Sequence, residues 1–183
     1  MSTATLSPRV VLHSSDSNEW YTPAPIIEVA RRVLGQIELD PASCAAANEI
    51  VQAARYYTIG DDGLRQPWRC NTLWLNPPYG KTGNRSNQDI WSQQLVQAYR
   101  VGLVGEAMLL VNAATDTAWF QALGRELPFC LIAGRLKFWR PEVPADSPTH
   151  GSALFYLGPM THIFKIVCKD LGITGGMWPG RTL

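Results

Sequence analysis

The stretch TLWLNPPYGK, residues 72–81, joins an apolar run to a polar, proline-rich turn. The apolar run is typical of a buried strand that ends near Leu75. The two consecutive prolines remove two backbone donors and force Asn76 and Pro77 out of the helical region. The sequence therefore predicts a strand that stops and leaves Asn76 and Tyr79 side by side on a stiff turn.

This turn is suited to holding a planar amine. The side-chain carbonyl of Asn76 and the backbone carbonyl of Pro77 are two acceptors that can converge on one point. The ring of Tyr79 offers a face to a flat heterocycle, and such stacking is worth about 1–3 kcal/mol per base. An exocyclic amine on a nucleobase fits this description. A Pro-Pro turn with a core tyrosine is the alternative interpretation.

Two other polar stretches also follow predicted strands. In LDPAS, residues 39–43, the carboxylate of Asp40 suits an ammonium group and the helix that follows suits a carboxylate, so an amino-acid moiety would fit there. A helix cap made by Ser43 beneath an Asp-Pro turn is the alternative. GDDG, residues 60–63, is by itself a turn signal. All three stretches lie at the carboxyl ends of strands, where open parallel sheets bind ligands.

Strand and helix patterns alternate outward from this motif. The first helix is expected to be capped by Thr22, with Pro23 in its first turn and Gly35 at its end, and Ser43 is expected to open the second helix. The alternation predicts an α/β fold with a mostly parallel sheet, helices on both faces and an antiparallel hairpin near the C-terminus. The predicted helices span 22–35, 44–55, 88–99, 115–127 and 160–172, and the predicted strands span 36–40, 56–58, 72–75, 107–114, 128–132, 135–139 and 153–157.

The composition is that of a globular domain. Of 183 residues, 46% are hydrophobic and 17% are charged, which excludes an intrinsically disordered chain. No apolar stretch approaches the roughly 20 residues needed to span a bilayer, so no membrane partner is expected. Residues 1–18 are expected to form a flexible leader because they are polar and lack the apolar core of a signal peptide. A single domain is expected over residues 19–183.

The cysteines, the histidines and the net charge bear on the cellular compartment, on a metal site and on a nucleic-acid partner. Four scattered cysteines without a CxxC pair indicate free thiols in a reducing cytoplasm. Three dispersed histidines give no reason to expect a metal site. The formal net charge of +1 neither requires nor excludes a nucleic-acid partner.

Taken together, these stretches resemble the phage-type DNA N-6-adenine methyltransferases, an S-adenosylmethionine-dependent family related to the Dam enzymes. The resemblance covers most of residues 19–158. It implies a Rossmann-like methyltransferase fold, DNA as the partner, a cytoplasmic location in a bacterial host or a phage-infected cell, and the marking of phage DNA against host restriction. The matching stretches are EWYTP, ELDPAS, ARYYT, DDGL, LWLNPPYG, NAATDTAWF, GRLKFW and HGSALFYLG.

The resemblance also implies roles for individual residues. Asn76 and Pro77 would hold the adenine amine, and Tyr79 would stack on a flipped base. Of the two acids in GDDG, Asp62 is expected beside the cofactor and Asp61 on the substrate side. The full expected catalytic set is Asn76, Pro77, Pro78 and Tyr79, and the expected cofactor-binding set is Trp20, Tyr21, Thr22, Pro23, Asp40, Pro41, Ala42, Ser43 and Asp62.

The sequence departs from the wider methyltransferase pattern in two ways. The segment 40–48 lacks the glycine-rich loop expected after the first strand, and no insertion is large enough for a full target-recognition domain. The polar stretch 80–89 and the loop 140–151 are therefore the places expected to contact DNA. The basic residues expected to meet phosphates are Lys81, Arg85, Arg135 and Lys137, with Arg140 beside them.

Two other functions stay open from the sequence. The same turn would present a planar amine of RNA adenine or of a protein glutamine to the same cofactor. A catalytically silent nucleic-acid-binding module that keeps the fold is the other alternative; the intact Asn-Pro-Pro-Tyr argues against it, and the missing glycines leave it open. The target sequence, the strand preference and the oligomeric state do not follow from these residues.

Overall fold

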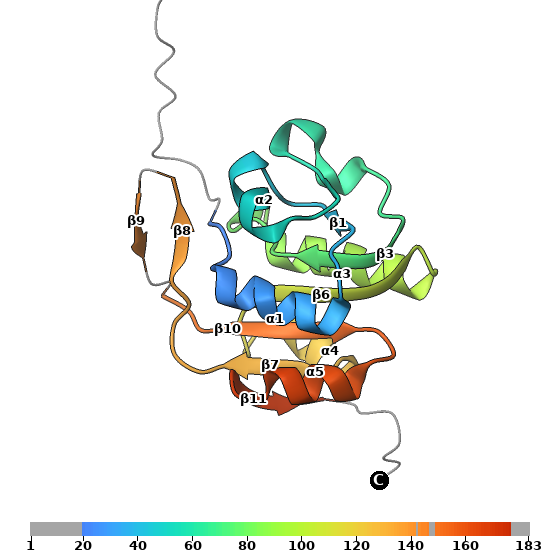
Figure 1. The fold of residues 1–183 in the computed structure, drawn as a ribbon, viewed down its shortest axis with the longest axis vertical. Helices are drawn as coiled ribbons and strands as arrows, with labels where there is room; N and C mark the ends of the chain where they lie inside the picture. Colours follow the sequence, from blue (N-terminus) through green and yellow to red (C-terminus); the bar gives the residue numbers. More distant parts are fainter. Residues whose placement is uncertain (1–19, 142, 147–148, 177–183) are drawn as a thin grey trace, which may run out of the picture.

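A computed structural model describes residues 20–141, 143–146 and 149–176 of the chain (Figure 1). The predicted leader, residues 1–18, lies outside the described residues. A seven-stranded sheet has the order β11-β7-β10-β6-β3-β1-β2, in which β10 and β11 run antiparallel to the other five strands. The strands are β1 (Leu39–Asp40), β2 (Arg55–Tyr56), β3 (Cys70–Leu75), β6 (Val104–Asn112), β7 (Phe129–Ile132), β10 (Ser152–Leu157) and β11 (Gly172–Gly175).

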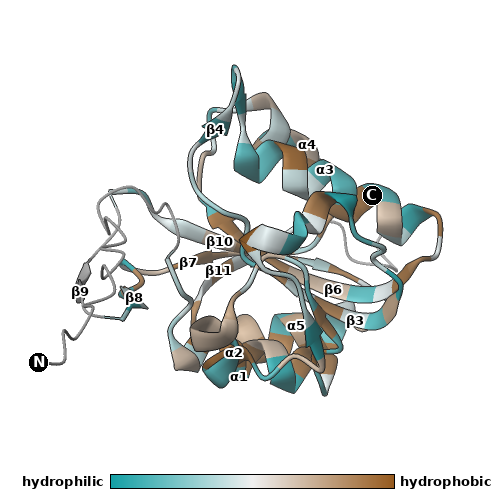
Figure 2. Cartoon of the chain, turned by 90° about the horizontal axis from the view of Figure 1, so that it is seen from above, coloured by the Kyte–Doolittle hydropathy of each residue, from teal (hydrophilic) through white to brown (hydrophobic). Residues whose placement is uncertain are grey.

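Helices cover both faces of this sheet, as Figure 2 shows from above. The helices α1, α2 and α5 lie on one side, and α3 and α4 lie on the other. Successive residues of a strand point to opposite faces, so Trp74 of β3 joins the core under α1 and α5 while Leu73 and Leu75 join the core under α3 and α4. The helices are α1 (Ala24–Leu34), α2 (Ala45–Val51), α3 (Asn87–Arg100), α4 (Ala118–Glu126) and α5 (Thr161–Cys168).

The predicted fold class is confirmed, including the antiparallel part near the C-terminus. The two strands expected there have different partners. Strand β8 (Phe138–Arg140) pairs with β9 (Val143–Asp146) in a hairpin outside the main sheet, whereas β10 inserts between β6 and β7. A second small hairpin, β4 (Lys81–Thr82) with β5 (Arg85–Ser86), follows the proline-rich turn and was not predicted.

The two helix caps predicted at the first helices are wrong. Pro23 occupies the N-cap of α1, and Thr22 makes no capping hydrogen bond there. The N-cap of α2 is Cys44, whose sulfur accepts the backbone N–H of Ala47 at 3.5 Å. Ser43 lies outside the helix, and its backbone N–H is bound to the carbonyl of Tyr57.

Helix α2 is also shorter than predicted. It ends at Val51 because Gln52 adopts the left-handed conformation, with φ of 52°. The side chain of Asn48 exchanges two hydrogen bonds with the backbone of Ala53 and so fixes the end of the helix. The chain therefore leaves the helix before Arg55 and forms β2, which pairs with β1.

Candidate functional site

A cavity of about 720 Å³ lies at the carboxyl ends of β1, β2 and β3. Its volume falls within the range usual for small-molecule sites. It brings together all three polar stretches singled out in the sequence, together with residues 20–22, which we call the strap. The lining residues that the sequence predicted are Trp20, Tyr21, Thr22, Asp40, Pro41, Ala42, Ser43, Asp62, Asn76, Pro77, Pro78 and Tyr79.

Asn76 enters the cavity from the end of β3. The last residues of this strand, Leu73–Leu75, are fully buried, so the turn that follows starts from a fixed point. The side-chain Nδ2 of Asn76 donates a hydrogen bond to the backbone carbonyl of Trp20 at 3.0 Å. Since this bond uses the NH₂ end of the amide, the carbonyl Oδ1 is left to accept hydrogen bonds from a ligand.

The ring of Tyr79 is held from the side by Phe138 of β8. The two ring centroids are 6.0 Å apart and the ring planes are nearly perpendicular, at 85°, which is a favoured aromatic arrangement. Burial raises the pKa of the Tyr79 phenol well above its usual range, so the side chain stays neutral at physiological pH. Tyr79 therefore offers an uncharged ring at the cavity wall.

The backbone of the same turn is anchored by Asn87, the first residue of α3. The Asn87 side chain donates to the carbonyl of Tyr79 at 3.0 Å, and it accepts from the hydroxyl of Thr82 at 2.8 Å. Its backbone N–H also binds the carbonyl of Gly80 at 3.0 Å. Asn87 lines the cavity, and sequence reasoning missed it because it is one of several asparagines in a polar stretch.

Asp40 is the buried carboxylate of the site. Its residue is only 3% exposed, and burial raises its pKa from 3.8 to about 7. The backbone N–H of Ala42, which donates to Asp40 Oδ1 at 3.1 Å, and the side-chain hydroxyl of Ser43 both partly offset this effect. The Ser43 hydroxyl is itself buried beside the carboxylate. A buried carboxylate and a buried hydroxyl thus lie together at the cavity.

Gly63 closes the floor of this region by direct backbone contact. A Cβ atom at this position would lie 2.0 Å from the carbonyl oxygen of Pro41, so only glycine allows the approach. The carbonyl of Gly63 in turn accepts a hydrogen bond from Trp68 Nε1 at 2.8 Å. The GDDG turn is therefore fixed against the DPAS segment.

The structure separates the two acids of the GDDG turn. Asp62 lines the cavity in a left-handed backbone conformation, with φ of 51°. Asp61 lies outside the cavity lining, because its carboxylate accepts hydrogen bonds from both the backbone N–H and the hydroxyl of Thr58, at 2.7 Å each. These bonds lower the pKa of Asp61. Of the two, Asp62 is the acid placed to meet a ligand.

The strap is held by β8. Tyr21 and Trp139 exchange both backbone hydrogen bonds, at 2.9 and 3.1 Å. The hydroxyl of Tyr21 accepts a hydrogen bond from the thiol of Cys44 at 3.1 Å. Pro23, predicted to bind the cofactor, caps α1 and is not part of the cavity lining.

Several lining residues were not predicted from the sequence. Ile59 is notable because its apolar side chain is 88% exposed at the cavity. An isoleucine within the otherwise polar run TIGDDG is the signal that would have indicated it. The other unpredicted lining residues are Ala47, Val51, Tyr57, Thr58, Gly63, Trp74, Asn87 and Trp91.

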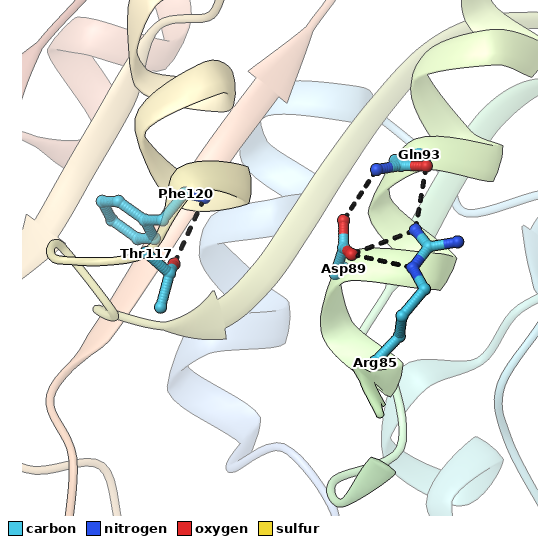
Figure 3. A network of polar contacts seen from close by, with 5 residues as sticks. All are labelled: Arg85, Asp89, Gln93, Thr117 and Phe120. Atoms are coloured by element: carbon cyan, nitrogen blue, oxygen red, sulfur yellow. Dashed lines mark hydrogen bonds and ion pairs between the residues drawn. The ribbon is translucent and has the colours of Figure 1, made fainter. Parts of the chain in front are cut away.

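The basic residues predicted to contact phosphates lie outside the cavity lining. Arg85 donates to Asp89 at 3.0 and 3.2 Å and to Gln93 at 3.0 Å, so its guanidinium is already engaged along α3 (Figure 3). Lys81, Arg135 and Lys137 are exposed.

Figure 3 also shows the cap of α4, where the hydroxyl of Thr117 accepts the backbone N–H of Phe120. Thr117 thereby caps the helix that was expected over residues 115–127.

Within residues 20–141, 143–146 and 149–176, no cluster of three or more His, Cys, Asp or Glu side chains is placed to bind a metal ion. In the same part of the chain, none of the helices has the length and apolar character that crossing a membrane requires.

A mostly parallel sheet flanked by helices, with its cavity at the carboxyl ends of the strands, defines a Rossmann-like methyltransferase fold. Residues 10–171 match the family model for DNA N-6-adenine-methyltransferase (Dam), and the chain belongs to this family. Membership implies DNA adenine N6-methyltransferase activity in general terms. Comparison with curated proteins gave no match.

Proposed function

We propose that this protein transfers a methyl group from S-adenosylmethionine to the exocyclic N6 amine of adenine in DNA. The observation that carries the proposal is the orientation of Asn76. Its NH₂ group is bound to the strap, so its carbonyl oxygen is the part of the amide that meets a ligand. An amine with two hydrogens to donate is the matching partner for that oxygen.

The residues around the cavity fit the cofactor. When bound, S-adenosylmethionine supplies an electrophilic methyl group on a sulfonium centre. The buried Asp40 carboxylate is suited to the ammonium group of the methionine end, and the buried Ser43 hydroxyl beside it is a further polar contact. The apolar and aromatic side chains of Ile59 and Trp91 line the same cavity and suit a flat heterocycle.

The chemistry proposed for the chain's own residues is positioning. Asn76 Oδ1 and the Pro77 carbonyl would accept the two amine hydrogens, which draws the amine toward a tetrahedral geometry and exposes its lone pair. The neutral ring of Tyr79 would stack on the base after it leaves the duplex. Fixed acceptors and a fixed ring lower the barrier without a covalent intermediate on the protein.

The DNA contacts are proposed to come from exposed cations outside the cavity. Lys81, Arg135 and Lys137 are exposed, whereas Arg85 would have to leave Asp89. We propose that a single domain from residue 19 onward carries the activity, in the cytoplasm where its DNA substrate is found. The free thiols agree with that compartment.

Incubation of the protein with unmethylated DNA and isotope-labelled S-adenosylmethionine, followed by nucleoside mass spectrometry, tests the proposal. We expect labelled N6-methyladenine from the wild type and none from Asn76→Ala. Gln97→Ala, at an exposed position of α3 outside the cavity lining, is the matched control and should keep wild-type activity. Calorimetry with S-adenosylmethionine checks that Asn76→Ala still binds the cofactor.

Parallel reactions with RNA and with protein extract separate the alternatives. Methyl transfer to either of these and not to DNA would replace the proposed substrate. Cofactor binding without transfer to any of the three would contradict the assignment of an enzyme. The absence of cofactor binding together with DNA binding would identify the silent nucleic-acid-binding module.

A further inference from the structure

We infer that strand β8 positions residues on both sides of the site, the substrate side and the cofactor side, through two adjacent side chains. Phe138 sets the ring of Tyr79 on the substrate side, and Trp139 sets the strap on the cofactor side. Neither residue lines the cavity, so neither is placed to touch a ligand. The inference rests on the proposed function and goes beyond it by adding two residues that act through others.

The location of β8 makes this double role possible. The β8–β9 hairpin lies beside the main sheet and is separate from it (Figure 1). Phe138 is nevertheless only 2% exposed and belongs to the core under α1 and α5. The pairing of β8 with β9 is irregular between Phe138 and Arg140, and the adjacent side chains of Phe138 and Trp139 reach different neighbours, Tyr79 and Tyr21.

The contact of Phe138 fixes the angle of the Tyr79 ring. The backbone of Tyr79 is held by Asn87, but a ring on a fixed backbone can still rotate about its side-chain bonds. The perpendicular ring of Phe138, with its centroid 6.0 Å away, restricts that rotation. Because Phe138 is itself buried, it cannot move aside without disturbing the core. The stacking face of Tyr79 is thus set before any base arrives.

The contacts of Trp139 fix the strap. Besides the two backbone hydrogen bonds with Tyr21, the indole Nε1 donates to the carbonyl of Thr22 at 3.3 Å. The indole and phenol rings of Trp139 and Tyr21 are also edge-on, with centroids 5.1 Å apart and planes at 77°. Two successive residues of the cavity wall, Tyr21 and Thr22, are therefore held in place through one tryptophan.

Two variants test the separate roles, with one matched control. Phe138→Leu removes the aromatic edge beside Tyr79, and Trp139→Phe removes the indole N–H while keeping a ring. Phe129→Leu removes a similar aromatic contact in β7, where Phe129 packs against Phe155 away from the cavity. Each variant is assayed for kcat on unmethylated DNA, for binding of S-adenosylhomocysteine by calorimetry, and for Tm.

The inference predicts that Phe138→Leu changes kcat and that Trp139→Phe changes the Kd of S-adenosylhomocysteine. Phe138→Leu should lower kcat about three- to tenfold and leave the Kd of S-adenosylhomocysteine near the wild-type value. Trp139→Phe should raise that Kd about fivefold and leave kcat at saturating cofactor near the wild-type value. Phe129→Leu should change Tm alone. If Phe138→Leu does not fold, Phe138→Met, which fills more of the same volume, is measured in its place.

The possible failures are distinguishable. A wild-type protein that neither binds S-adenosylhomocysteine nor methylates DNA overturns the proposed function and this inference with it. A wild-type protein that does both, with variants that change kcat and Kd together or that behave like Phe129→Leu, overturns the inference alone. In that case β8 would be an ordinary structural strand.

Discussion

The side chain of Asn76 is bound to the backbone carbonyl of Trp20, a residue 56 positions earlier in the chain, at 3.0 Å. This single bond connects the NPPYG turn, residues 76–80, to the strap. It orients the amide, so that the NH₂ group faces the strap and the carbonyl oxygen is left for a ligand. The substrate side and the cofactor side of the proposed site meet at this bond.

Substitutions of Asn76 test its two roles, as the acceptor for the amine and as the donor to the Trp20 carbonyl. Asn76→Ala removes both, and we expect kcat to fall by about 100-fold or more. Asn76→Asp keeps an acceptor but loses the donor to Trp20, and its carboxylate would face that carbonyl. We expect it to be similarly inactive and less stable by about 1 kcal/mol. Single-turnover rates and denaturant unfolding measure the two effects; substantial activity in Asn76→Ala would exclude the assigned role.

Substitutions of Tyr79 should distinguish its ring from its hydroxyl. The phenol is neutral because burial raises its pKa, and stacking needs only the ring. Tyr79→Phe should therefore keep kcat within about threefold of wild type, whereas Tyr79→Ala should lose about 5- to 150-fold, the equivalent of 1–3 kcal/mol of stacking. Steady-state kinetics with saturating cofactor measure this. A large loss in Tyr79→Phe would point to proton chemistry at the hydroxyl instead.

The buried carboxylate of Asp40 should make stability depend on pH. Its pKa is raised from 3.8 to about 7, so between these values the folded protein holds a proton that the unfolded chain has lost. The free energy of unfolding should therefore fall as the pH rises from about 4 to 7, and the full penalty persists above that range. Asp40→Asn, in the absence of cofactor, should be more stable than wild type at pH 8 by up to about 4 kcal/mol, and nearly equal to it at pH 4.

The same substitution should weaken the cofactor site. If Asp40 pairs with the ammonium group, wild-type affinity for S-adenosylmethionine should rise as the pH rises through about 7, since the carboxylate becomes charged there. Asp40→Asn should bind weakly with no such pH dependence. Glu49 is an exposed acid of α2 outside the cavity lining, and Glu49→Gln is the control for a general loss of negative charge. Calorimetry from pH 6 to 8.5 measures both variants; parallel pH profiles in all three proteins would contradict the assignment.

Asn87 should matter more than its polar neighbours. Asn87→Ala removes the hydrogen bond to the Tyr79 carbonyl and leaves that carbonyl half-buried, so we expect kcat to fall about tenfold. Thr82→Ala removes the hydrogen bond from the Thr82 hydroxyl to Asn87 Oδ1. It should have a smaller effect, because this oxygen can accept a hydrogen bond from water instead. Equal losses of kcat in the two variants would indicate that the whole β4–β5 hairpin, rather than Asn87, supports the turn.

The salt dependence of DNA binding should identify which cations meet phosphates. Each lysine that neutralises a phosphate contributes about 0.9 to the slope of log affinity against log salt. Lys81→Ala or Lys137→Ala should each lower the slope by about that amount. Arg85→Ala should change it less, because its guanidinium is bound to Asp89 and Gln93. Fluorescence anisotropy over a range of NaCl concentrations measures the slopes; a flat response in the wild type would exclude phosphate contacts altogether.

The sequence was sufficient for the elements that depend on local pattern. The apolar runs of β3 and β6, the spacing of α1 and α3 and the proline-rich end of β3 all act over a few neighbouring residues. The fold class followed from their alternation. The caps at Thr22 and Ser43 were wrong because a cap depends on the backbone path before the helix, and at Ser43 that path is fixed by a hydrogen bond to Tyr57.

The sequence alone determined which residues are able to do chemistry here, because residue type and strand ends are local properties. It indicated Asp40, Asp62 and the NPPYG turn, and the fold places all of them around one cavity. Only the tertiary structure decided how these groups are held: Trp20 against Asn76, Phe138 against Tyr79, and Trp139 against Tyr21. These pairs are far apart in the chain, and no local pattern encodes a contact that exists only after the strands have assembled.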